Sequence, residues 1–217
     1  MLGAMALLRL SVVFAILASM GNATTIILTS LDMALGEQNS LWIDENGTAQ
    51  ALGWVGGINA TVDGHPRVLW CVQLFVNASL NQTYNATIDF ADTPNLQRVG
   101  WLIATQLSKV TTPTLGAAFQ LAIWDIMEDN GDGFAVGAGK VYQSTNLTHP
   151  TDSSVLTAAQ AYEAQSFGKT YKWVPVYHNV ALNGTDVQDL IGPIVPDGGP
   201  FSQAPEPAGV APMMHSP

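Results

Sequence analysis

Two side chains in this sequence have types and surroundings suited to covalent chemistry. The single cysteine, Cys71, lies in the apolar segment Leu-Trp-Cys-Val-Gln-Leu. A thiol is both a strong nucleophile and a good leaving group. Further along, Gln120 lies in Phe-Gln-Leu-Ala-Ile-Trp and carries an acyl group on a flexible stem. It follows Phe119 by one residue, about 100° of helix rotation, so we expect it at the edge of a buried helix face.

The beginning of the chain predicts export, which makes the cysteine count informative. In residues 1–23, Arg9 is the only charge before an apolar run, and small residues follow that run. This pattern predicts a secretory signal peptide, with an uncleaved anchor helix as the alternative. An exported chain with one cysteine forms no internal disulfide. Cys71 is therefore expected to be buried and inert, paired between chains, or committed to other covalent chemistry.

The elements that must position these residues follow from the hydrophobic period. Branched and aromatic residues separated by turn residues predict strands at 26–28, 41–43, 50–58 and 68–76, with one more exposed strand within 77–92. Helical spacing then predicts helices that begin at Thr93-Pro94 and Thr112-Pro113, the second ending near 129–133, and a third over 152–167. Strand character returns at 171–177 and 179–182.

This order of elements predicts an α+β fold, with a β-sandwich or barrel-like body and an inserted helical subdomain of about three helices over residues 93–167. With 47% hydrophobic and 11% charged residues, one domain over 24–192 can bury a sizeable core. Residues 193–217 hold seven of the twelve prolines and are expected to form a tail.

The segments around Cys71 and Gln120 resemble the thioester domains of bacterial surface proteins, especially those of proteins with PEP-type C-terminal sorting signals. Those domains have an aromatic-Cys-Val-Asp-Leu strand and a later helix that reads roughly Gln-x-Ala-Ile-Trp. The matching residues are Trp70-Cys71-Val72-Gln73-Leu74 and Gln120-Leu121-Ala122-Ile123-Trp124. Similarity extends to 98–102, 131–134, 179–182 and 190–193, and thus over most of the expected mature chain. Pro205-Glu206-Pro207 is similar to the sorting tripeptide, but an apolar helix and a basic end do not follow it here.

The resemblance implies that the sulfur of Cys71 attacks the carboxamide of Gln120 and expels ammonia to leave a thioester. A lysine amine would then displace Cys71 and keep the glutamine acyl group as an amide, once per molecule. The chain is therefore expected to be a single-event covalent binder and not an enzyme with turnover, and no cofactor is expected. A dry pocket would protect the bond, and its expected residues are Trp70, Gln73, Trp101, Trp124 and Asp125.

One position departs from the family pattern. Gln73 stands where the family usually has an aspartate, and on a strand it would share the face of Cys71. An amide cannot replace an acid that assists the departure of ammonia. Asp125, His65 and Asp63 are the candidate substitutes in this sequence.

Other functional classes find little support in the sequence. The net charge of −10 disfavours nucleic acid as a partner, and the four histidines have no metal-ligand spacing. Residues 128–133 are similar to the first half of a calcium loop, but the twelfth position is Gly139 and not a carboxylate, so a helix-ending turn is the preferred interpretation. The eight Asn-x-Ser/Thr sequons are interpreted as by-products of a surface rich in Asn and Thr.

The sequence therefore predicts a secreted or surface-exposed adhesion module that captures an amine-bearing target, acts as a monomer and has no membrane span in the mature chain. The alternative is a non-covalent extracellular binding or matrix protein with the same fold and no thioester. A hydrolase with paired carboxylates has only the acidic composition in its favour.

Overall fold

A computed structural model describes residues 24–45, 48–74, 76–136, 139–143, 152–180 and 187–193. The expected signal peptide and all but the first residue of the expected tail lie outside these residues. The elements are β1 (Thr24–Glu45), β2 (Thr48–Val62), β3 (His65–Cys71), β4 (Thr83–Phe90), α1 (Pro94–Gln106), the short 3-10 helix η1 (Leu107–Lys109), α2 (Pro113–Asp129), β5 (Tyr142–Gln143), α3 (Ser153–Ser166), β6 (Pro175–Val180) and β7 (Leu190–Ile191).

The body of the protein is a closed antiparallel β-barrel. Six strands follow one another in the order β1-β2-β3-β7-β6-β4, and β4 pairs with β1 to close the ring. The two-residue strand β5 adds to the far part of β1. The fold therefore mixes strands and helices as predicted, and its body is barrel-like: the strands form one sheet that closes on itself.

The longest strand, β1, replaces two of the predicted strands, because residues 26–28 and 41–43 belong to one element. Its pairing with β2 is interrupted by three irregularities, which allow so long a strand to bend around the barrel. At one of them Gly36 pairs with Gly56, and a Cβ on Gly56 would overlap the main chain of Gly36. Glycine is required at this close crossing.

The three predicted helices are confirmed, and each begins with a side-chain cap. Thr93 and Thr112 each accept a hydrogen bond from the main chain of the first turn and stand before a proline, which is a favoured helix start. Asp152 caps α3 in the same way. The second helix ends where predicted, at Asn130, which has the left-handed conformation with φ 68°. None of the helices in the described ranges has the length and apolar character needed to cross a membrane.

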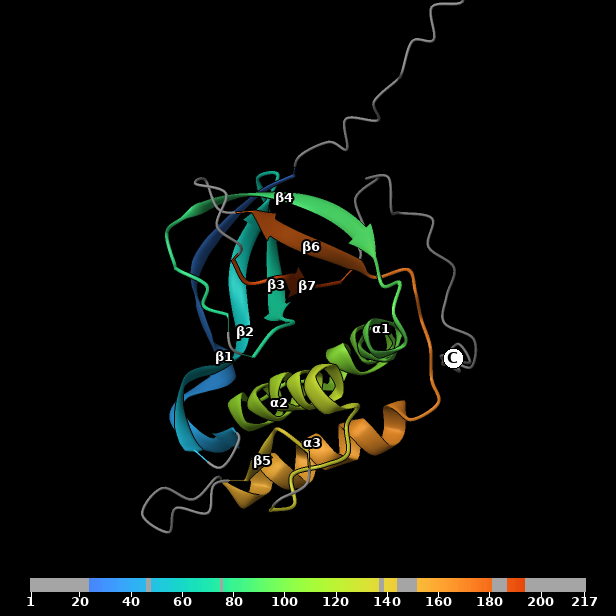
Figure 1. Cartoon of the computed structure of the whole chain (residues 1–217). Coiled ribbons are helices and arrows are strands. Elements are labelled where there is room, and N and C mark those ends of the chain that lie inside the picture. Colours follow the sequence, from blue (N-terminus) through green and yellow to red (C-terminus); the bar gives the residue numbers. More distant parts are fainter. Residues whose placement is uncertain are drawn as a thin grey trace, which may run out of the picture.

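The helices lie at one end of the barrel: α2 packs against β1, β2 and β3, and α3 lies on the side of α2 away from the barrel (Figure 1). The helix α2 is buried from Gly116 to Ile126. It approaches β1 so closely that a Cβ on Gly116 would overlap the carbonyl of Leu35. Two apolar cores result, one inside the barrel and one between the barrel and the helices, and Cys71 packs at the edge of both.

Candidate functional site

Cys71 is the last residue of β3, at the end of the barrel that faces the helices. On one side β3 pairs with β7, where Cys71 stands opposite Leu190. The main-chain N–H of Val72 donates to Asp189 on that same side. Because N–H groups of successive strand residues point to opposite sides, the N–H of Cys71 points away from β7, towards the side of β2.

Gln120 meets Cys71 at this open side. Its Oε1 accepts a hydrogen bond from the main-chain N–H of Cys71 at 2.9 Å, and its Nε2 donates to the main-chain oxygen of Cys71 at 2.8 Å. The Gln120 side chain is fully buried. Folding thus brings the carboxamide of α2 against the residue of β3 that carries the thiol.

The carboxamide occupies the position of a missing strand partner. The register of β2 with β3 stops at Ile58 and Leu69. The next pair in the hydrogen-bonded series would join Gly56 to Cys71, but the pairing of β2 with β3 ends before it. Gln120 supplies the acceptor and the donor that β2 does not supply. A glutamine side chain is uncharged and carries both a hydrogen-bond donor and an acceptor. This explains why a glutamine stands at this buried position of α2.

Aromatic packing fixes the relative position of β3 and α2. Trp70 and Phe119, which precede Cys71 and Gln120 in the sequence, meet edge to face with ring centroids 4.9 Å apart. Phe119 in turn meets Tyr162 of α3 at 5.2 Å. Both Trp70 and Phe119 are fully buried. These ring contacts fix β3 relative to α2. Cys71 and Gln120, the next residue of each element, therefore meet.

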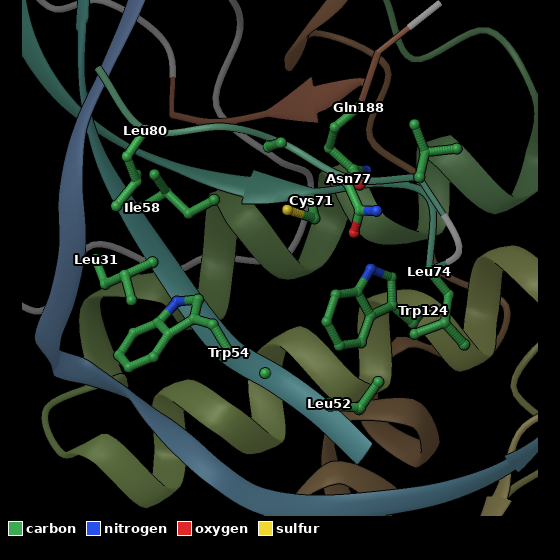
Figure 2. A pocket seen from close by; sticks show the side chains of 13 residues that line it. Leu31, Leu52, Trp54, Ile58, Cys71, Leu74, Asn77, Leu80, Trp124 and Gln188 are labelled. Carbon is green, nitrogen blue, oxygen red and sulfur yellow. The ribbon is translucent and has the colours of Figure 1, made fainter. Parts of the chain in front are cut away.

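Cys71 lines a pocket of about 700 Å³ between the barrel and α2. Most of its lining residues have apolar side chains, such as Trp54, Leu74, Leu80 and Trp124, although polar atoms contribute about as much exposed surface as apolar atoms. Figure 2 shows the sulfur of Cys71 pointing into this pocket, with Trp54 and Trp124 to either side. A small ligand could therefore reach the sulfur from the pocket.

The pocket also presents a hydrogen-bond donor without a partner. The Nε1 of Trp124 is buried and makes no hydrogen bond. In Figure 2 this nitrogen lies on the edge of the ring that faces Cys71 and Asn77. Trp54 differs, because its Nε1 donates to the main-chain oxygen of Gly57. Among the described residues of the pocket, Trp124 thus offers an unused donor to a negatively charged or carbonyl oxygen near Cys71.

Burial suppresses ionisation of the thiol. Loss of solvent around Cys71 raises its pKa to about 12. The free thiol is therefore protonated at neutral pH and is a weak nucleophile towards external reagents. Any reaction of this sulfur depends on a partner placed next to it by the fold.

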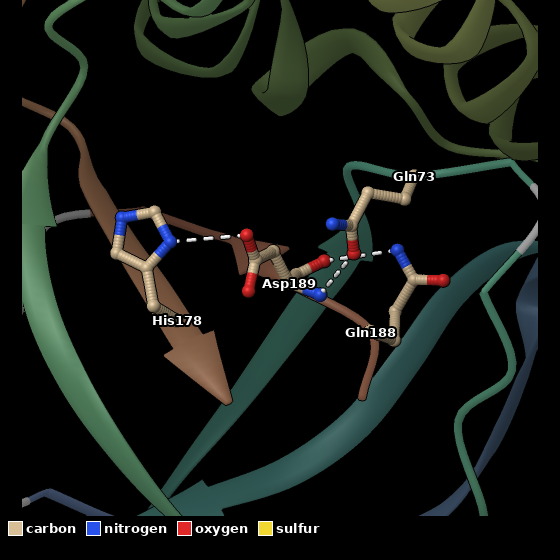
Figure 3. A network of polar contacts seen from close by, with 4 residues as sticks. All are labelled: Gln73, His178, Gln188 and Asp189. Carbon is tan, nitrogen blue, oxygen red and sulfur yellow. Dashed lines mark hydrogen bonds and ion pairs between the residues drawn. The ribbon is translucent and has the colours of Figure 1, made fainter. Parts of the chain in front are cut away.

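Gln73 lies outside the pocket lining, contrary to the expectation. The strand β3 ends at Cys71, so strand alternation does not carry Gln73 onto the face of Cys71. Its Oε1 accepts a hydrogen bond from the main-chain N–H of Asp189 at 2.8 Å, and Asp189 also binds His178 through its carboxylate at 3.0 Å. Figure 3 shows this network, in which Gln73 joins the segment after β3 to the segment before β7.

Three further residues expected in the pocket also lie elsewhere. Trp70 is in the core beneath Cys71, and Trp101 is a half-buried residue of α1 that packs on the helical core. Asp125 is fully buried, and its Oδ2 accepts a hydrogen bond from the N–H of Gly133. Of the five expected pocket residues, only Trp124 lines the described pocket.

The candidate substitutes for the family's acid are also distant from the sulfur. His65 opens β3, six residues before Cys71, which corresponds to about 20 Å along a strand. Asp63 lies in the preceding turn and accepts a hydrogen bond from the N–H of Thr25. Neither lines the pocket.

Some pocket residues were not identified from the sequence. Trp54, Asn77 and Gln188 come from β2, from the segment after β3 and from the segment before β7. The sequence offered no local signal for them, because only barrel closure brings these segments together. Compared with protein-family models, curated proteins and solved structures, the chain matches none.

Proposed function

We propose that this protein captures amines covalently through an internal thioester between Cys71 and Gln120. The observation that carries the proposal is the pair of hydrogen bonds, 2.9 and 2.8 Å long, that hold the Gln120 carboxamide on the main chain of Cys71. The only cysteine of the chain and a fully buried glutamine thus meet across two elements far apart in sequence.

Formation of the bond requires the carboxamide to turn towards the sulfur. The Cys71 sulfur adds to Cδ of Gln120, and the C–N bond then breaks. The departing nitrogen takes the thiol proton and leaves as ammonia, so that thiol and carboxamide become thioester and ammonia. The reaction gives up at least one of the two hydrogen bonds to Cys71, and the neighbouring ring contact of Trp70 with Phe119 keeps strand and helix in place meanwhile.

The sulfur is the nucleophile when the thioester forms and the leaving group when an amine is captured. An amine that enters the pocket attacks Cδ, negative charge develops on the acyl oxygen, and Cys71 leaves with a proton from the amine. The main-chain N–H of Cys71, which already donates to Oε1 of Gln120 at 2.9 Å, and the unpaired N–H of Trp124 are the candidate donors to that oxygen. The raised pKa of Cys71 makes its thiolate a poor leaving group, which slows hydrolysis of the stored bond until a nucleophile is held in position.

The biological setting proposed for this reaction is outside the cell. The signal peptide predicted for residues 1–23 and the resemblance to thioester domains of surface proteins support a secreted or surface-exposed adhesion module. The acidic surface, with a net charge of −10, favours encounter with lysine-rich targets. Each molecule reacts once, so the protein is proposed to be a covalent binder and not an enzyme with turnover.

A second candidate is non-covalent binding by the same pocket. The observation in its favour is that Gln120 already satisfies the main chain of Cys71 where β2 is absent, which is a sufficient structural reason for the residue. In that case the pocket of about 700 Å³ would bind an apolar group, and Cys71 would be an inert part of its wall.

Amine labelling separates the two candidates. The purified protein is incubated with isotopically labelled methylamine, digested and sequenced by mass spectrometry. Covalent capture predicts one label per chain, on the side chain of Gln120, together with a newly titratable thiol at Cys71. Cys71→Ala must abolish the label, whereas Gln165→Glu, at an exposed glutamine of α3, must retain it. A chain without label at Gln120 would leave only the non-covalent candidate.

A further inference from the structure

Four carboxylates gather at the end of α2, away from the lining of the Cys71 pocket. Asp125 and Asp129 lie one turn apart on α2, and Asp132 follows in the loop. One oxygen of each lies within 4.8 Å of the others. Glu163 of α3 adds a fourth carboxylate, which lies close enough to Asp125 for each to alter the pKa of the other.

No protein cation forms an ion pair with this cluster within the described part of the chain. The charge of Arg98 acts on Asp125 and Glu163, but its guanidinium donates to Ser166 Oγ and to the main-chain oxygens of Asn130 and Glu163. The one ion pair found among the described residues joins His178 to Asp189 and lies elsewhere. The last turn of α2 contains no basic residue, so the negative end of the helix dipole adds to the repulsion.

Each buried carboxylate has an oxygen that accepts no hydrogen bond from an N–H or hydroxyl group. These oxygens are Asp125 Oδ1, Asp129 Oδ1 and Glu163 Oε1, and the side chains within hydrogen-bond reach of Asp125 are the carboxyls of Asp129 and Glu163. The other oxygens of the two aspartates are held by the main chain: Asp125 Oδ2 accepts from the N–H of Gly133 at 3.1 Å, and Asp129 Oδ2 from the N–H of Val141 at 3.0 Å. One oxygen fixed by a hydrogen bond and the other left bare is the arrangement of a carboxylate that ligates a metal.

The burial of these groups makes the bare oxygens costly. Asp125 is fully buried and Glu163 is 5% exposed. A buried carboxylate oxygen without a partner costs free energy. A bound cation would give these oxygens a partner and would offset the repulsion between the carboxylates.

We propose that Asp125, Asp129 and Asp132 form a calcium-binding site, with Glu163 as a neighbouring carboxylate. All the donors are oxygens, which are the ligands of hard cations. Oxygens that bind one Ca²⁺ at 2.3–2.6 Å are at most about 5 Å apart, and the spacing of the three aspartates fits within this span. Asp132 and Glu163 also line an open pocket of about 340 Å³, which provides a path for the ion and room for water ligands.

This site differs from the calcium loop considered from the sequence. The twelfth position of that loop, Gly139, contributes no side chain. It has φ 58° and comes so close to the carboxylates of Asp129 and Asp132 that a Cβ would overlap them. The three aspartates come from α2 and the loop that follows it, and Glu163 of α3 lies beside Asp125.

Calcium titration of the chelator-treated protein tests the site. We expect binding heat in calorimetry. We also expect the unfolding temperature to rise by about 5–10 °C when Ca²⁺ is at a hundredfold excess over its Kd. Asp129→Asn and Asp132→Asn should each weaken binding at least tenfold. Glu128→Gln removes the same charge from the same turn of α2 without touching the cluster, and it should bind as the unchanged protein does.

Three results would overturn the proposal. The first is no heat and no thermal shift in the unchanged protein up to about 10 mM Ca²⁺, above the range of weak extracellular sites. The second is an equal shift in Asp129→Asn and in the unchanged protein. The third is a larger response to Mg²⁺ than to Ca²⁺. Asp132 is exposed, so Asp132→Asn still tests calcium binding if a substitution at a buried carboxylate prevents folding. The calcium proposal does not rest on thioester formation.

Discussion

The carboxamide of Gln120 lies across the main chain of Cys71, with Oε1 2.9 Å from its nitrogen and Nε2 2.8 Å from its oxygen. This relationship ends the β2–β3 ladder and also brings an acyl group next to the only thiol of the chain. A structural role and a chemical role therefore fall on the same two residues, and they make separable predictions.

The structural role predicts a stability loss in Gln120→Leu. Leucine is of similar size but leaves the N–H and C=O of Cys71 without partners in the protein. Each buried unpaired group costs about 1–3 kcal/mol, so we expect the free energy of unfolding to fall by about 2–4 kcal/mol. Urea denaturation measures this loss in a Cys71→Ala background, in which no thioester can form. Gln165→Leu, at an exposed position of α3, should change stability by less than about 0.5 kcal/mol; a similar small effect at Gln120 would refute the ladder role.

Close packing of α2 on β1 predicts that Gly116→Ala destabilises the protein. In an open helix the change stabilises by up to about 1 kcal/mol. Here the new Cβ would overlap the carbonyl of Leu35, and we expect a loss of about 1–3 kcal/mol. Thermal unfolding shows whether Gly116→Ala stabilises or destabilises the protein. Gly53→Ala, where a Cβ meets no atom within 4 Å, is the control. An unfolding temperature at or above that of the unchanged protein would contradict the close approach.

The raised pKa of Cys71 predicts slow alkylation of the folded thiol. After the thioester has been opened by methylamine, burial keeps the pKa of Cys71 at about 12 instead of the ordinary 9.0. The thiolate fraction at pH 8 is then about a thousandfold lower than for a free cysteine. Alkylation by iodoacetamide should be slower by about this factor and should rise with pH until the protein unfolds. Reaction at the rate of a free thiol would contradict the buried position.

The same pKa shift predicts a pH dependence of stability. A thiol whose folded pKa lies above its unfolded pKa stabilises the fold fully below pH 9 and loses that contribution as pH rises towards 12. The amine-opened protein should therefore lose stability in this window relative to Cys71→Ala. Urea denaturation across the window checks the difference, and parallel curves for the two proteins would contradict it.

The free indole N–H of Trp124 predicts a kinetic effect without a large structural one. Trp124→Phe removes the donor, which has no protein partner to lose. Aminolysis of the thioester by methylamine should slow by about 100-fold, as for loss of one oxyanion donor. Trp54→Phe is the matched control, because the Nε1 of Trp54 is already bound to Gly57 and should not affect the acyl oxygen. Equal rates for Trp124→Phe and the unchanged protein would remove Trp124 from the mechanism.

Local features of the fold were predictable from the sequence, and distant contacts were not. The Thr-Pro pairs at 93–94 and 112–113 predicted two helix starts correctly, because a cap depends on adjacent residues. The continuity of β1 and the existence of the two-residue strand β7 were missed, since both depend on barrel closure. Likewise, Gln73 was assigned to the face of Cys71, but β3 ends at Cys71, two residues before Gln73, so strand alternation does not apply.

The candidate sites divide in the same way. Cys71 and Gln120 were identified because each lies in a distinctive segment, although the hydrogen bonds through the main chain were not foreseen. The acidic cluster was interpreted as a helix-ending turn, which is correct for Asn130. The fourth carboxylate, Glu163, comes from another helix, and no sequence spacing links it to Asp125.

The intact mass of the denatured, purified protein tests the central claim most directly. If sulfur and carboxamide have joined, the mass is lower than that calculated from the sequence by one ammonia, and Cys71→Ala and Gln120→Glu show no such deficit. A full calculated mass, with Cys71 freely alkylated once the chain is unfolded, would contradict covalent capture.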